Sequence, residues 1–422
     1  MPTPSLLIVP ARFKTGRLYS QIPTNTDNRG DFTVTRNTAA RRFNSAGLIE
    51  SVASGIPRLD YYTSGGVTGC PALLVEPAAT NLHTYSEAFD QNYTAIATTI
   101  SGTNLTAPDN SSTADRYFEN AGVSTHVVAL AGGGAGFAVT SGTVYTISAF
   151  IKGIGGRNSR FSVTNAGSGN VLYTLSGNGS VSNSSIGAIQ YFGNDWYRCS
   201  LTFTATGTTN FRQSIFSVSG STDSFDGDPT KGIMLWGAQL ETGSVATSYI
   251  PTTTGTGSRS ADVISVSGAV SGSIGQLSGT IYAEMDVRVL GDGRFATLSD
   301  GTSNNRIQCR FNSAINGLDF LVVVSGSSVG FSVSNSTHPS FPVTIPAGTY
   351  KIALGYKQND YVVAMNGVTY TPTVTTRNVP LNFSKVTLGA DVSDLNQFNN
   401  RIRAVALYTT RLTNAELATL TA

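Results

Sequence analysis

The sequence predicts an all-β fold: an N-terminal arm, then two antiparallel β-sandwich (jelly-roll) domains, with one short C-terminal helix. Two observations lead to this prediction. Only 12% of the 422 residues are charged and 45 are glycine, a composition typical of short strands joined by tight turns. Apolar runs of strand length recur between turns rich in Gly and Asn, and no window keeps a 3.6-residue period over the length of a helix.

The length of the chain exceeds what one hydrophobic core usually supports, so we expect several domains. Residues 251–258 are Pro, Thr, Gly and Ser, which predicts a loop too poor in apolar residues to pack and places the main boundary near Gly255. We therefore expect an arm at 1–80, a sandwich at 81–254, a linker at 255–262 and a second sandwich at 263–422.

The N-terminal arm is basic, with only Asp27 and Asp31 as acidic residues before position 43. Such a segment can hardly fold alone, so we expect it to dock on the next domain, a neighbouring copy or a larger particle; a solvated flexible arm is the alternative. Within it, residues 44–47 predict a hairpin turn in which Gly47 supplies a positive φ. The candidate attachment residues are Arg12, Lys14, Arg17, Arg36, Arg41 and Arg42.

Local signals place the strands and the helix. Asn366-Gly367 lies between two β-prone runs and predicts a tight hairpin. Thr413 and Glu416 have capping-box spacing, and Leu412 and Leu417 are spaced as a hydrophobic staple, which predicts a helix after a strand at 402–408. The other expected strands are 126–130, 144–151, 197–203, 211–218, 233–240, 279–289, 318–324, 350–356 and 386–388.

Charge and cysteine content exclude several classes of protein. A net charge of +2 gives no field that would draw in nucleic acid, and the basic residues match no nucleic-acid motif. Cys70, Cys199 and Cys309 lie in different regions, so we expect free, mostly buried thiols. The N-terminus lacks a signal-peptide pattern, and no stretch approaches the ~20 apolar residues of a spanning helix, so we expect no membrane insertion and folding in a cytoplasm.

Four stretches together resemble a known family: residues 36–50, 71–81 and 84–89, and Trp236-Gly-Ala-Gln-Leu-Glu241 with Tyr249-Ile-Pro251. They are similar to tailed-bacteriophage virion proteins that form tail-fibre, head-fibre and spike-like appendages. The middle region resembles a carbohydrate-binding-module sandwich. The end of the chain resembles the concanavalin A-like lectin/glucanase jelly roll, including its laminin G-like variants.

The resemblance implies a homo-oligomeric, often trimeric, appendage on the virion surface, made and assembled in the host bacterial cytoplasm. The implied partners are other virion proteins, reached through the arm, and host-surface polysaccharide. Non-catalytic adhesion to glycans is the favoured function. Passive decoration or connection of the particle is the alternative, and a polysaccharide depolymerase is the third.

A glucanase-like carboxylate pattern is incomplete in this chain. Glucanases of the jelly-roll fold carry Glu-x-Asp-x-x-Glu on one strand; here Glu284 and Asp286 match, and Val289 replaces the second glutamate. Glu284 and Asp286 would share a strand face roughly 6.6 Å apart. Arg288 on the same face favours ionised carboxylates, whereas a general acid must be protonated. We therefore predict no enzymatic activity and no catalytic residues.

Metal and cofactor signals are weak. His83, His126 and His338 lie in no nucleophile or metal-ligand pattern. Asp223, Asp226 and Asp228 could offer oxygen ligands to a structural calcium ion, but their spacing is not that of a helix-loop-helix calcium loop and a polar turn explains it equally. We expect no other cofactor.

Sugar recognition needs an exposed aromatic face with hydrogen-bonding groups beside it. Trp196 and Trp236 sit in or beside apolar runs, so we predict core packing for both. By analogy with lectin-like folds, the candidate glycan contacts lie in or near turns of the last domain: Asn305, Arg306, Tyr356, Asn359, Asp360 and Tyr361.

Overall fold

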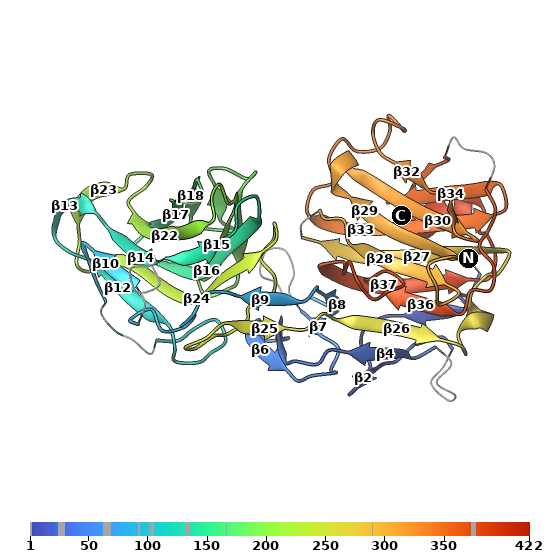
Figure 1. Cartoon of the computed structure of the whole chain (residues 1–422), viewed down its shortest axis with the longest axis horizontal. Coiled ribbons are helices and arrows are strands. Elements are labelled where there is room, and N and C mark those ends of the chain that lie inside the picture. The colour runs from blue at the N-terminus through green and yellow to red at the C-terminus, as the bar shows by residue number, and fades with distance from the viewer. Residues whose placement is uncertain are drawn as a thin grey trace.

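The computed structural model confirms the all-β prediction, with two β-sandwiches side by side (Figure 1). The structure describes residues 2–23, 30–61, 69–91, 93–100, 102, 105–130, 136–165, 167–288, 290–372 and 377–422. Within these ranges the only α-helix is α1 (Asn414–Thr421), and two short 3-10 turns lie at Ser271–Ser273 and Ser313–Ile315. No helix in these ranges is long and apolar enough to cross a membrane.

The first sandwich packs two antiparallel sheets around one apolar core, since buried residues of both sheets form a single cluster. One sheet has the order β10 (Tyr93–Ile96), β14 (Val127–Leu130), β22 (Thr209–Val218), β17 (Asn158–Thr164), β18 (Gly169–Thr174), β19 (Ser180–Val181), with β15 (Phe137–Val139) also on β22. The other has the order β11 (Thr98–Ile100), β12 (Asp115–Glu119), β24 (Gly232–Thr242), β16 (Val144–Ile154), β21 (Tyr197–Thr204), β20 (Gly187–Tyr191). A short ribbon of β13 (Gly122–Thr125) and β23 (Ser224–Gly227) flanks them.

The second sandwich is built in the same way and has the larger core. Its first sheet runs β35 (Val368–Tyr370), β34 (Asp360–Met365), β33 (Gly348–Lys357), β27 (Ser278–Val287), β37 (Asn400–Tyr408), β8 (Ala72–Val75), β7 (Leu59–Asp60), with β1 (Leu6–Ile8) also on β37. The second runs β2 (Phe13–Lys14), β3 (Arg17–Leu18), β4 (Phe32–Thr35), β26 (Val263–Ser267), β36 (Lys385–Leu388), β28 (Arg294–Ser299), β29 (Arg306–Asn312), β30 (Gly317–Val324), β31 (Ser327–Ser328), with β32 (Phe331–Val333) also on β30.

The N-terminal segment, expected to dock on the next domain, a neighbouring copy or a larger particle, supplies strands to both sheets of the second sandwich. β1 and β8 pair with β37, and β4 pairs with β26. Leu6, Phe32 and Leu73 are fully buried in the second core. The physical reason is that these short apolar bursts complete sheets whose other strands come from residues beyond 262. In Figure 1 the blue strands run along the base of both sandwiches.

A hairpin of the same segment also covers the first sandwich. β5 (Ala40–Phe43) pairs with β6 (Ile49–Val52), and Gly47 has φ +77°, which confirms the predicted turn. Phe43 and Ile49 of this hairpin form a small buried cluster with Trp196, Trp236 and Tyr249. The predicted core packing of both tryptophans is therefore confirmed, on the sheet face that the hairpin covers.

The loop at 251–258 is held more firmly than its composition suggested. Thr252 is buried and its backbone N–H donates to the Ser86 hydroxyl at 2.8 Å. β25 (Gly257–Arg259) pairs with β9 (Ala79–Asn81) between the two sandwiches. Arg259 and Asp262 are buried. Six of residues 251–258 are exposed, as their composition predicted, and hydrogen bonds rather than apolar contacts hold the segment.

The short-range signals of the second sandwich are confirmed. Asn366 and Gly367 have φ of +47° and +85° between β34 and β35, as a type I′ turn requires. Thr413 caps α1 in a capping box with Glu416. Leu412 and Leu417 are buried in one cluster, which packs the helix on the outer face of its sheet.

Candidate functional site

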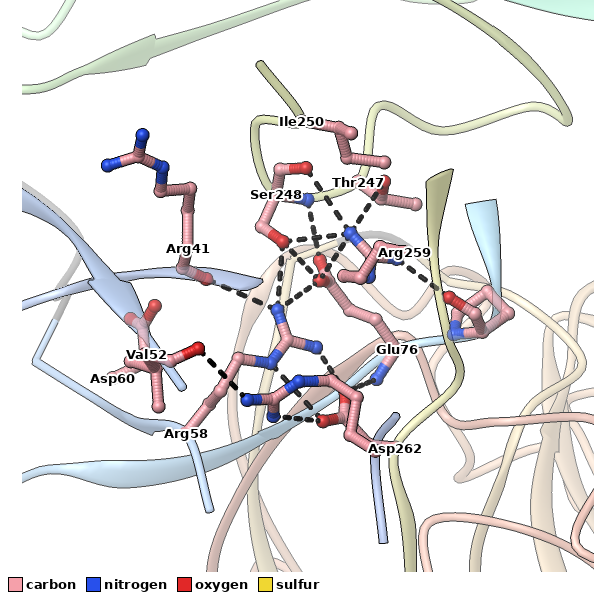
Figure 2. A network of polar contacts seen from close by, with 12 residues as sticks. Arg41, Val52, Arg58, Asp60, Glu76, Thr247, Ser248, Ile250, Arg259 and Asp262 are labelled. Carbon is pink, nitrogen blue, oxygen red and sulfur yellow. Dashed lines mark hydrogen bonds and ion pairs between the residues drawn. The ribbon is translucent and has the colours of Figure 1, made fainter. Parts of the chain in front are cut away.

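The two sandwiches meet at a network of buried charged side chains (Figure 2). Arg58 precedes β7, Glu76 follows β8, and Arg259 and Asp262 lie between the sandwiches in the chain. Arg58 Nη1 lies 2.6 Å from Glu76 Oε2, and its Nη2 pairs with Asp262. Arg259 Nη1 lies 3.2 Å from the same Glu76 oxygen. These ion pairs thus connect three segments that lie far apart in the sequence.

The loop that follows β24 joins this network through Ser248. Its backbone N–H and its hydroxyl donate to the two oxygens of Glu76 at 2.8 and 2.6 Å. Arg36 Nη1 adds an ion pair to Asp262 at 3.1 Å. Burial would raise the pKa of Glu76, but Arg259, Arg58, Arg288 and the Ser248 hydroxyl together hold it well below its usual range. Glu76 is therefore ionised and shared by several arginines.

A cleft of about 260 Å³ opens beside this network, between the two sandwiches. Gln190 on β20 lies directly opposite Arg198 on β21, so both project from the same face of their sheet. Asp286 at the end of β27, with Arg288 just beyond it, faces them from the second sandwich. The lining residues are Ala188, Ile189, Gln190, Arg198, Ser200, Val245, Ala246, Asp286, Val287, Arg288, Ala347 and Gly348.

Arg198 is a buried cation that forms no ion pair with a carboxylate in the described part of the chain. Its side chain donates from Nη1 to the Thr247 carbonyl at 2.6 Å and from Nη2 to the Ser148 hydroxyl at 3.1 Å. Its guanidinium carbon lies 5.3 Å from the centroid of the Phe150 ring. Burial lowers the pKa of Arg198 to about 10, with the charge of Glu241 acting in the opposite direction.

Arg288 and Asp286 supply the opposite wall of the cleft with partly compensated charges. Arg288 Nη2 lies 3.4 Å from Glu76 Oε1, on a carboxylate that already serves Arg58 and Arg259. Burial and repulsion from Arg401 lower the pKa of Arg288. Asp286 Oδ2 lies 3.4 Å from Arg401 Nη1. The cleft thus presents two cations and one carboxylate that is itself paired.

The carboxylate pattern at β27 is divided between different partners. Glu284 accepts a hydrogen bond from the Tyr282 hydroxyl at 3.4 Å, while Asp286 pairs with Arg401. Arg288 pairs with Glu76, the partner that the sequence pattern had not indicated. Val289 lies outside the described residues.

The predicted glycan contacts are not brought together. Tyr356 and Tyr361 are only 1% and 4% exposed, so the expectation that they contact sugar was wrong: both rings pack in the second core. Asn305 and Arg306 lie at the start of β29, whereas Asn359 and Asp360 lie at the β33–β34 turn in the other sheet. These four remain predictions as glycan contacts.

The six candidate attachment residues divide into two groups. Arg12 and Lys14 are exposed and lie over the Tyr19 ring, with Arg17 on the neighbouring strand β3. Arg42 pairs with Glu50 at 2.7 Å, and Arg41 lies 4.0 Å from Asp109. Arg36 is 2% exposed, so its expected role in attachment was wrong; it binds Asp262 and the carbonyls of the same N-terminal segment.

The aspartates proposed for calcium have other partners. Asp223 pairs with Arg160, Asp226 accepts from the Gly122 N–H at 3.1 Å, and Asp228 lies 3.3 Å from Lys231. Within the described ranges no three His, Cys, Asp or Glu side chains are grouped to hold a metal ion. Calcium at this loop stays a prediction. Cys199 and Cys309 are buried and Cys70 is exposed, all three as free thiols, as predicted.

No known protein family and no curated relative matches the chain. Among solved structures it is similar to the NanB sialidase of Streptococcus pneumoniae, at 16% identity and a TM-score of 0.30 over 37% of this chain and 26% of that one. It is also similar to the CBM40 domain of a Ruminococcus gnavus IT-sialidase, at 14% identity and a TM-score of 0.28 over 35% of this chain and 84% of that one. A SAP-like pentraxin of Limulus polyphemus is similar at 13% identity and a TM-score of 0.27, over 35% of this chain and 70% of that one. These partial likenesses assign no residue and no ligand to this chain.

Proposed function

We propose that the chain is a non-catalytic, glycan-adhesive component of a tailed-phage virion surface, displayed in several copies, with three as the expected number. The resemblance of residues 36–50, 71–81 and 236–241 to virion appendages supports the location. The observation that carries adhesion is the cleft between the sandwiches: a concave site with an aliphatic lining and a few convergent polar groups is the usual form of a small-ligand site.

The buried network supports this function by fixing the cleft geometry. A site made from two domains binds weakly when the domains must be ordered first, because ordering costs free energy. Here Ser248, in the loop after β24 of the first sandwich, bonds Glu76 and Arg58 on the side of the second sandwich before any ligand arrives. Several rigid copies on one particle would then raise avidity by ~10²- to 10⁴-fold over a single weak site.

A glycan array tests the adhesion. The full chain is applied once as purified protein and once coupled at high density to beads. We expect selective glycan signals that rise strongly with valency. An array that stays blank at high valency would contradict adhesion and favour the passive decoration or connector role.

Three further measurements test the other parts of the proposal. Light scattering that gives a monomer at all concentrations would contradict the trimer.

An antibody against the chain should label intact particles, and the position of the label distinguishes tail, collar and capsid. Release of sugar fragments from host polysaccharide that Glu284→Gln abolishes would replace adhesion by depolymerase activity.

A further inference from the structure

We propose that the cleft between the sandwiches recognises an acidic saccharide, whose carboxylate lies between Arg198 and Arg288. This inference rests on the proposed glycan adhesion and names the class of sugar. It begins from the charge balance of the junction, where six arginines face five carboxylates. The arginines are Arg36, Arg58, Arg198, Arg259, Arg288 and Arg401, and the carboxylates are Asp60, Glu76, Glu241, Asp262 and Asp286.

The positive excess is concentrated at the cleft. Arg36, Arg58, Arg259 and Arg401 each lie within 3.2 Å of a carboxylate oxygen. Among the described residues, Arg198 has only neutral hydrogen-bond acceptors, and the ion pair of Arg288 is a contact of 3.4 Å with the already shared Glu76. A buried cation without a direct ion pair is costly, and a ligand carboxylate would supply the direct contact that Glu241 does not make with Arg198.

Both guanidinium groups retain donors for such a ligand. Each Nη atom of Arg198 carries two N–H bonds but has one acceptor within the described residues. Arg288 Nη1 has no acceptor there, and its side chain is 19% exposed. Charge-assisted bonds from two arginines to one carboxylate are among the stronger hydrogen bonds in proteins.

The rest of the lining fits one sugar ring. Ile189, Val245 and Val287 offer aliphatic surface to C–H groups, and Gln190 and Ser200 offer hydrogen bonds to hydroxyls. A volume of about 260 Å³ is close to the lower end, ~300 Å³, of small-molecule sites. Asp286 on the same wall would repel a second negative group, so the cleft favours a single carboxylate over a polyphosphate.

Calorimetry with paired ligands tests the inference on the full chain. The probes are oligogalacturonate, a hyaluronan tetrasaccharide and sialyllactose, each with a methyl-esterified counterpart that keeps the sugar and removes the charge. We expect at least one acidic probe to bind about 10- to 100-fold more tightly than its ester, with affinity falling as salt rises. Acetate and inorganic phosphate alone should compete poorly at matched ionic strength.

Arg288→Gln should weaken binding of the acidic probe by about 10- to 100-fold. Arg294→Gln is the matched control: it removes a partly buried arginine of the same sandwich that does not line the cleft, and affinity should not change. Arg198→Gln should act like Arg288→Gln. Tryptophan fluorescence in urea verifies that each variant is folded, and Arg288→Gln alone decides the result if Arg198→Gln is unfolded.

Equal binding of acid and ester, equal competition by acetate or phosphate, or an equal loss in Arg294→Gln would overturn the inference. Binding of neutral glycans without any acidic probe would overturn it while leaving glycan adhesion intact. A loss of all glycan binding, on the array and in the calorimeter, would instead contradict the proposed function itself.

Discussion

The sandwich interiors and the junction between them are both buried, but they are held by opposite kinds of side chain. Leu298, Phe320 and Val363 lie in an apolar core without exposed surface. Arg58, Glu76 and Asp262 are buried to the same degree but carry full charges. An apolar core loses stability in proportion to the atoms removed, whereas a buried ion network depends on each member, because removal of one leaves an uncompensated charge. The junction should therefore be the less tolerant region.

The largest effect should come from Glu76→Gln. This change leaves Arg58, Arg259 and Arg288 without their shared counter-ion, so we expect a loss of about 3–5 kcal/mol in the free energy of unfolding. Urea unfolding is followed by circular dichroism for the whole chain and by tryptophan emission for the first sandwich, where Trp196 and Trp236 pack. The two transitions should coincide in the unmodified chain and separate in the variant.

The control for this change is Asp195→Asn, which breaks an exposed pair with Lys152 at 3.6 Å. Its cost should stay below about 1 kcal/mol. Equal losses in the two variants would mean that the buried network adds nothing beyond a surface ion pair.

The core of the second sandwich should respond in a graded way. Leu298→Ala removes a fully buried side chain and should cost about 2–5 kcal/mol. In the unmodified background the urea midpoints followed by circular dichroism and by tryptophan emission should both fall, because the network couples the sandwiches. In the Glu76→Gln background only the midpoint followed by circular dichroism should fall. A lower midpoint by tryptophan emission in that background would show that other contacts couple the sandwiches.

Acid should weaken the first sandwich through His83. Its ring is buried, with one nitrogen 2.7 Å from the Thr84 carbonyl, and burial lowers its pKa from 6.5 to about 4. The unfolded chain takes up this proton first, so stability falls as pH drops below 6.5 and the loss levels off near pH 4, at up to about 3 kcal/mol. Tryptophan-detected unfolding of His83→Gln should lack this contribution. An unchanged pH profile in that variant would assign the loss to other groups.

The smallest effect concerns the helix on the outer face of the second sandwich. Thr413→Ala removes the cap and its capping box, and should cost about 1 kcal/mol. Thr419→Ala is the matched control, because the Thr419 hydroxyl donates to the Ala415 carbonyl within the same helix and caps no helix end. It should be neutral or slightly stabilising. Similar losses in both would contradict a specific role for the cap.

Features that depend on neighbouring residues could be predicted from the sequence. The Asn366-Gly367 turn and the Thr413 cap need only the residues beside them, and both are present. The burial of Trp236 followed from the apolar run around it. Its place in one buried cluster with Phe43 did not, because the two residues lie nearly two hundred positions apart in the sequence.

The candidate site depended on long-range pairing, which one sequence does not reveal. Arg36 and Asp262 are 226 residues apart in the sequence, so nothing near Arg36 indicates its partner. The basic N-terminal residues were therefore interpreted as an exposed attachment surface, although several of them form ion pairs within the chain. The exposure predicted for Tyr356 was wrong for a related reason. Residues 352–356 of β33 are buried on both faces of the sheet, so alternation along the strand does not place any of these side chains in solvent. The one available signal was the presence of Glu76, Arg259 and Asp262 inside otherwise apolar or small-residue stretches.

The pairing of β1 with β37 determines when the second sandwich can be completed during synthesis. Ser5 bonds the Leu407 carbonyl across 402 residues, so the pairing of β1 with β37 cannot form until β37 leaves the ribosome. At ~5–20 residues per second this delay is roughly 20–80 s. The first sandwich can close during that time, while the apolar N-terminal strands wait exposed. A nascent chain halted before residue 400 should therefore be the form that chaperones bind and proteases cut.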